Sequence, residues 1–103
     1  MTKVILYHDK GGVPCGFECR GHAGFAEEGH DIVCAAVSVL ATTCVNALES
    51  VAGQAPELET GDGLVKAHLD QPNHDAVVLL KAFEQGIQDI GQSYSKYIRI
   101  TVR

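Results

Sequence analysis

The stretch DIVCAAVSVLATTCVNAL, residues 31–48, decides the fold of this chain because it is apolar at nearly every helical position. Asp31 is a favoured N-cap residue type, so we predict a helix from Asp31 to about Val51. A helix that is apolar on all sides must be covered by a sheet on one side and by something else on another. The polar residues within the stretch favour a buried helix over a membrane span. They are Ser38, Thr42, Thr43 and Asn46.

The segment before this helix predicts a β-hairpin. Val4 to His8 is a run of strand-forming residues, and Lys10-Gly11-Gly12 is a turn signal. In residues 17–20 apolar and charged side chains alternate, as in a half-buried strand. Residues 21–30 contain three glycines and no periodic pattern, which predicts a loop between the hairpin and the helix.

The segment after the helix predicts a second hairpin. Gly53 and Pro56 end the helix, because glycine and proline both disfavour its continuation. Residues 57–60 and 64–69 then flank the turn signal Gly61-Asp62-Gly63. Two short strands with a glycine-rich turn between them are typical of a hairpin.

A second helix and a final strand complete the pattern. Pro72 and Asn73 introduce the helix, and residues 98–102 alternate as a strand with one buried face does. The helix has one apolar face, formed by Ala76, Leu79, Leu80, Phe83, Ile87 and Ile90. The predicted order is ββαββαβ, an α/β sandwich of two helices on a mixed sheet. With 103 residues there is room for one core, so residues 1–103 are predicted to be a single domain.

Charge and the N-terminal sequence limit the classes of function. The formal net charge is −5, and the lysines and arginines form no run, so we predict no direct nucleic-acid binding. The N-terminus has neither the long apolar region nor the small-residue cleavage site of a secretory signal. We therefore expect a cytoplasmic protein without a membrane segment, in which the four cysteines are free thiols.

Cys19 and Cys44 have a structural interpretation, whereas Cys15, at the start of a predicted strand, could be either a core or a functional residue. Cys15 and Cys19 lie four residues apart on a predicted strand, a span of about 13 Å. A zinc ion would need both sulfurs at about 2.3 Å, so a cluster of these two with His22 is not favoured. Cys44 lies deep in the apolar helix and, like Cys19, is predicted to be a core residue. We predict no metal site and no cofactor, and the absence of a CxxC pair argues against a thiol redox protein.

Cys34 is a candidate nucleophile because of its place in the predicted helix. With Asp31 as the N-cap, Cys34 is the third helical residue, where unpaired backbone amides and the helix macrodipole favour a thiolate. The nearby Asp31 carboxylate opposes a second negative charge. From helix position alone, a buried packing cysteine is favoured over a nucleophile.

His22 is the candidate proton partner of Cys34. It lies between Gly21 and Gly24, in the predicted loop that follows the second strand. An imidazole beside a thiol can take its proton and later return it to a leaving amine. His30 is the rival base, and spacing alone does not exclude it.

Asp31 and Ser38 are candidate supporting residues. Ser38 lies one helical turn beyond Cys34, on the same face. Its hydroxyl could bond near the thiolate or to a helix carbonyl. Asp31 could cap the helix, orient a histidine, or do both. If its carboxylate accepts from the Cys34 amide, that amide cannot serve in the oxyanion hole, which stays unassigned.

The run Gly21-His22-Ala23-Gly24, then Gly29, then residues 31–38 (DIVCAAVS) resembles the ribosomal-processing cysteine protease family, known as Prp. The resemblance extends over the whole chain and implies a cysteine endopeptidase with a Cys–His dyad of Cys34 and His22. It alone chooses His22 over His30. It also implies a substrate, the bacterial large-subunit ribosomal protein numbered twenty-seven, whose N-terminal extension the protease removes beside an aromatic pair.

The predicted assembly is a homodimer. An all-round apolar helix in so short a chain needs more cover than one sheet face provides. The family resemblance implies the same assembly.

Overall fold

The computed structural model describes residues 1–21 and 28–103, with the backbone alone for residues 28–31. Seven elements follow one another in the order ββαββαβ, which confirms the predicted order. They are β1 (Thr2–His8), β2 (Pro14–Arg20), α1 (Glu28–Ser50), β3 (Glu57–Gly61), β4 (Leu64–His68), α2 (His74–Ser93) and β5 (Ile98–Val102).

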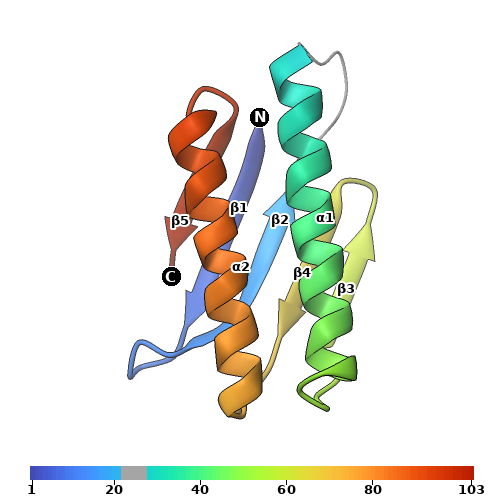
Figure 1. The fold of residues 1–103 in the computed structure, drawn as a ribbon, viewed down its shortest axis with the longest axis vertical. Coiled ribbons are helices and arrows are strands. Elements are labelled where there is room, and N and C mark those ends of the chain that lie inside the picture. Colours follow the sequence, from blue (N-terminus) through green and yellow to red (C-terminus); the bar gives the residue numbers. More distant parts are fainter. Residues whose placement is uncertain (22–27) are drawn as a thin grey trace.

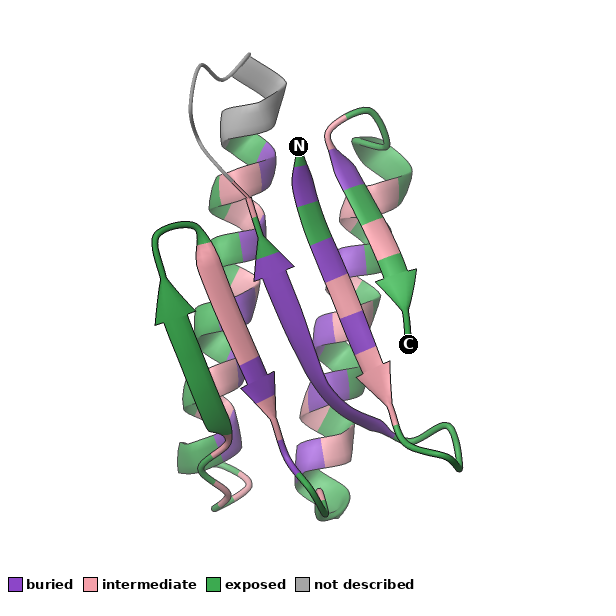
Figure 2. Cartoon of the chain, turned by 180° about the vertical axis from the view of Figure 1, so that it is seen from behind, coloured by how far each residue is buried: buried purple, intermediate pink, exposed green. Residues whose placement is uncertain are grey.

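The strands form one sheet in the order β3-β4-β2-β1-β5. β1 pairs with β5 in parallel, whereas the other neighbouring pairs are antiparallel, so the sheet is mixed as predicted. Both helices cover the same face of the sheet (Figure 1). Seen from behind, the other sheet face lies in front of the helices (Figure 2). The architecture is therefore a two-layer α/β sandwich.

The core lies between the helices and the sheet. The rings of Phe17 in β2 and Phe83 in α2 stack with their centroids 4.1 Å apart. α1 contributes one buried stripe at helical spacing, made up of Val33, Val37, Ala41, Cys44 and Leu48. The segment Ile32–Ser50 is long and apolar enough to cross a membrane by length and composition alone, a test that core helices also pass. Here its buried stripe packs in the core.

α2 begins as its sequence predicts. Asn73 is the N-cap, and its side-chain oxygen accepts a hydrogen bond from the Ala76 amide at 2.9 Å. This bond satisfies one of the backbone donors that a helix start leaves unpaired. The buried residues of α2 all belong to the predicted apolar face.

The predicted start of α1 is wrong. The helix begins at Glu28, one turn before Asp31, so Asp31 is an internal helical residue and not the N-cap. Asp31 is a favoured N-cap by residue type, but residue type is only one of the factors that decide where a helix starts. An earlier start adds a turn of backbone hydrogen bonds, and glutamate is a favoured residue type in a first turn.

Gly16 provides a test of the β2–β4 packing. A Cβ atom at Gly16 would lie 2.3 Å from the Ala67 carbonyl oxygen and 3.0 Å from the His68 Cα, both in the β4 backbone. We expect Gly16→Ala to lower the free energy of unfolding by about 1–3 kcal/mol, the usual range for overpacking. Urea denaturation measures this loss. Gly61→Ala is the matched control, because nothing lies within 4 Å of its added Cβ. Equal stability of the two variants would contradict the packing.

Candidate active site

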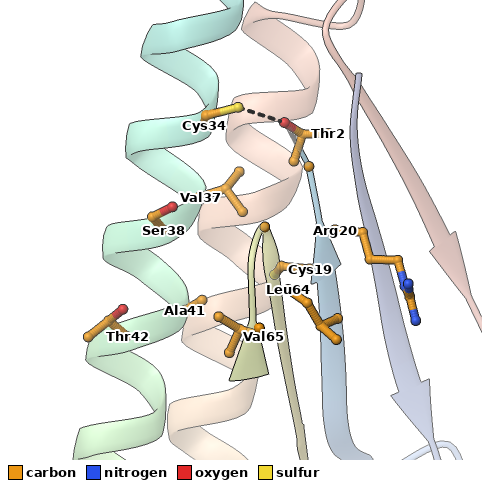
Figure 3. Close-up of a pocket in the computed structure, with 13 residues that line it drawn as sticks. Thr2, Cys19, Arg20, Cys34, Val37, Ser38, Ala41, Thr42, Leu64 and Val65 are labelled. Carbon is orange, nitrogen blue, oxygen red and sulfur yellow. Dashed lines mark hydrogen bonds between the residues drawn. The ribbon is translucent and has the colours of Figure 1, made fainter. Parts of the chain in front are cut away.

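Cys34 lies on α1 beside the first residue of β1. Its Sγ is 3.3 Å from Thr2 Oγ1, within hydrogen-bonding distance for sulfur. A dashed line marks this contact in Figure 3. The thiol is partly exposed, whereas Thr2 is only 3% exposed. The site thus pairs an accessible cysteine with a buried hydroxyl from a strand that is distant in sequence.

The position of Cys34 in α1 contradicts the prediction that the start of the helix stabilises its thiolate. Because the helix begins at Glu28, Cys34 is its seventh residue and lies in the second turn, not the first. The macrodipole effect falls off within the first turn, and only the first four amides lack an intrahelical partner. The start of α1 therefore does not activate this thiol, and the Cys34 amide is not an oxyanion donor.

A pocket of about 240 Å³ opens beside Cys34, between α1 and the β3–β4 hairpin. One wall is held in place by the hydrogen bond from the Gly21 amide to the Gly63 carbonyl, 3.0 Å long. Ser38 lies one turn from Cys34 on the same side of α1 and also lines the pocket (Figure 3). The small and apolar lining residues include Val37, Ala41, Gly61, Gly63, Leu64 and Val65.

The other three cysteines are buried, as predicted for Cys19 and Cys44. Burial raises the pKa of the Cys19 thiol to about 12, and burial likewise raises the pKa of Cys44 to about 12. The pKa of Cys15 is also raised, first by burial and then by the charges of Asp9, Glu84 and Asp70. A thiol with such a pKa is protonated at neutral pH and is a poor nucleophile.

Two of the predicted site residues cannot be placed as side chains. His22 lies outside the described residues, and Asp31 is described by its backbone alone. The choice of His22 over His30 therefore stays a prediction. Among the residues that the structure describes, no three metal-ligating side chains lie close enough to hold an ion. His22, the third member of the disfavoured zinc cluster with Cys15 and Cys19, lies outside the described residues.

Thr2 is a site residue that the sequence pattern does not indicate. The run of strand-forming residues predicts a first strand from Val4, whereas β1 begins at Thr2. The alternation of Thr2, Val4 and Leu6 is the signal that could have found it, because side chains two residues apart share a face of a strand. That alternation does not show that the Cys34 side chain on the helix would lie opposite Thr2.

Comparison with known proteins supports a protease. The family model described as Cysteine protease Prp matches residues 1–99. The Ribosomal processing cysteine protease Prp of Bacillus subtilis (strain 168) is 33% identical over 101 residues, covering 91% of this chain and 88% of that protein. The crystal structure of an essential ribosomal processing protease Prp from S. aureus with a substrate peptide has a TM-score of 0.92 at 27% identity. The same S. aureus protease with a covalently linked product peptide has a TM-score of 0.88 at 28% identity. Each of these two comparisons covers 100% of both chains.

The partly exposed cysteine beside a pocket, on a fold shared with these enzymes, defines the chain as a cysteine protease. More narrowly, it belongs to the ribosomal-processing cysteine protease Prp family, whose model covers nearly its whole length.

Alkylation should distinguish Cys34 from the other thiols. We expect iodoacetamide at neutral pH to label Cys34 in the folded protein, while Cys19 and Cys44 stay unmodified because they are buried and protonated. Peptide mass spectrometry after timed quenching measures the order in which the cysteines are alkylated. The denatured protein is the control, in which all four thiols should react. Labelling of Cys19 as fast as Cys34 in the folded state would contradict the site.

Proposed function

We propose that this protein is a cytoplasmic endopeptidase that removes the N-terminal extension of the bacterial large-subunit ribosomal protein twenty-seven. In this proposal Cys34 is the nucleophile and His22 its proton partner. The observation that carries the proposal is Cys34 lining a pocket, within a DIVCAAVS run that resembles the Prp motif. The S. aureus relative with a covalently linked product peptide supports a covalent route.

The proposed reaction has two halves. His22 takes the Cys34 proton, and the thiolate attacks the carbonyl carbon of the scissile peptide bond. The C–N bond then breaks, and the imidazolium gives its proton to the leaving amine, so that a thioester remains on Cys34. Water gives a proton to His22 and attacks the thioester. The C–S bond breaks, the extension peptide leaves with a new carboxyl terminus, and the proton returns from His22 to sulfur.

The pocket beside Cys34 is the proposed site for a side chain next to the scissile bond. Its volume of about 240 Å³ is below that of most drug-sized ligand pockets and suits one large side chain. Its apolar lining fits the aromatic residues that the family resemblance implies at the cut. Ser38, on its wall, is proposed to support the thiolate, and Asp31 to orient His22. The proposal includes no metal, no cofactor, no membrane and no direct contact with nucleic acid.

Substitution of the proposed dyad tests the assignment. We expect Cys34→Ala and His22→Ala each to lower kcat/KM on the extended ribosomal protein by at least about a thousandfold, because each removes a group that bonds or transfers a proton. His30→Ala should keep much of the activity. Cleavage is followed by mass spectrometry, with native circular dichroism as the check on folding.

Cys15→Ala is the matched cysteine control, since Cys15 is buried and does not line the pocket. It should retain activity per folded molecule. Wild-type cleavage by Cys34→Ala would sink the assignment, and inactivity of His30→Ala with an active His22→Ala would show that the base is His30.

We also propose that the protein is a homodimer. On α1, Ile32 and Val39 are 48% and 65% exposed, although both are large and apolar. Ala35 and Ala36 lie between them at helical spacing, so the four residues form an apolar stripe on the side away from the core. A second copy of this chain would cover that stripe.

Sedimentation tests the dimer. At micromolar concentration we expect a mass about twice the 11.0 kDa of the chain. Val39→Lys should shift the protein to a monomer, because a charge in an apolar interface is costly to bury. Val78→Lys is the matched control, since Val78 is similarly exposed but lies on α2. A monomeric wild-type protein would rule out the dimer.

A further inference from the structure

Thr2 is a polar residue in an apolar row. It shares the helix-facing side of β1 with Val4 and Leu6, which are both core residues. A buried hydroxyl without a partner costs free energy, whereas valine has nearly the same shape and no such cost. The hydroxyl of Thr2 has its partner in Cys34 Sγ, 3.3 Å away. Threonine, unlike valine, therefore gives the Cys34 thiol a hydrogen-bond partner at this position.

The surrounding backbone holds Thr2 in place. Its amide donates to the Tyr97 carbonyl at 3.0 Å, and its Cα is in register with Ile98 of β5. On the other side, a Cβ at Gly21 would lie 2.9 Å from Thr2 Oγ1 and 3.3 Å from Thr2 Cα. Only a residue without a side chain leaves this space to the hydroxyl. Threonine is also stiff at χ1, so the oxygen has few alternative positions.

The direction of the bond depends on the charge of the sulfur. In the thiol state either group can donate. Once Cys34 has lost its proton, sulfur has none to give, and the Thr2 hydroxyl must be the donor. Hydrogen bonds to a charged acceptor are about twice as strong as neutral ones. The contact therefore strengthens when the nucleophile forms.

Because Cys34 lies in the second turn of α1, the thiolate needs stabilisation from neighbouring groups in place of the helix start. We propose that Thr2 is a positioning residue that donates a hydrogen bond to the Cys34 thiolate and holds the sulfur beside the pocket. This inference rests on the proposed role of Cys34 as the nucleophile.

The expected gain in reactivity is moderate and can be bounded. A hydrogen bond that raises the thiolate fraction tenfold lowers its intrinsic nucleophilicity by only about threefold, because the Brønsted coefficient for thiols is near 0.4–0.5. A net effect of about threefold therefore remains at a pH where the thiol is mostly protonated. Loss of a fixed sulfur position adds to this effect in peptide cleavage.

The test compares Thr2→Val, Thr2→Ser and Thr101→Val in the full chain. Thr101 is the matched control, since it is exposed in β5 and its alternation with Ile100 places it on the opposite face of the sheet. The measurements are the rate of Cys34 alkylation by iodoacetamide at one neutral pH, and kcat/KM on the extended substrate. Thr2→Val should slow alkylation about threefold and cleavage at least as much. Thr2→Ser should restore both, and Thr101→Val should change neither.

Three outcomes would overturn the inference. Wild-type alkylation by Thr2→Val would show that the hydroxyl does not act on the thiolate, even if cleavage slows. Failure of Thr2→Ser to restore alkylation, with a native thermal midpoint, would reduce Thr2 to a packing role. An equal loss in Thr101→Val would make the effect non-specific. If Thr2→Val lowers the thermal midpoint, Thr2→Ala replaces it as the variant without a hydroxyl.

The alkylation rate also separates this inference from the proposed function. It reports on the Thr2–Cys34 bond whether or not Cys34 attacks a peptide. Wild-type cleavage by Cys34→Ala would therefore remove the assignment of Cys34 as the nucleophile, while slow alkylation in Thr2→Val would still establish the Thr2–Cys34 bond.

Discussion

Packing of the buried α1 stripe against the sheet sets the geometry of the site. Val33 and Val37 are core residues, and Cys34 lies between them in sequence. Because successive helical residues are about 100° apart, fixing the two valines leaves Cys34 at the border between core and solvent. The same helix that supplies core volume therefore presents Cys34, the proposed nucleophile. A change in how α1 packs would move the thiol and the pocket together.

The register of β1 is the second constraint on the site. β1 is hydrogen-bonded on both sides, to β2 and to β5, so its register is specified twice. A shift of one residue would turn Thr2, Val4 and Leu6 to the open face. Pairing with β5 is parallel and joins the first strand to the last. The position of Thr2 in the site thus depends on β5, a strand at the far end of the sequence.

The four cysteines show how environment separates one residue type into two roles. Cys19 lines the same pocket as Cys34, yet its thiol is buried and its pKa is raised to about 12. Cys34 is partly exposed and has a hydroxyl beside it. Exposure and a polar neighbour, and not proximity to the pocket, distinguish the candidate nucleophile. The internal position of Cys34 in α1 also places it beyond the first turn, within which the macrodipole effect falls off.

The sequence by itself determined the order of the elements, the apolar face of α2 and the choice of Cys34 as the candidate nucleophile. Each of these depends on local periodicity or on a contiguous motif, which a single chain segment carries. It misplaced the start of α1, because cap preferences differ by only about 1 kcal/mol and a further turn of helix can outweigh them. Only the tertiary structure decided that Thr2 lies at Cys34, that Gly21 leaves room for its hydroxyl, and that the β3–β4 hairpin forms a pocket wall. Those contacts join residues distant along the chain, and their geometry follows from strand register and helix packing, which no local pattern encodes.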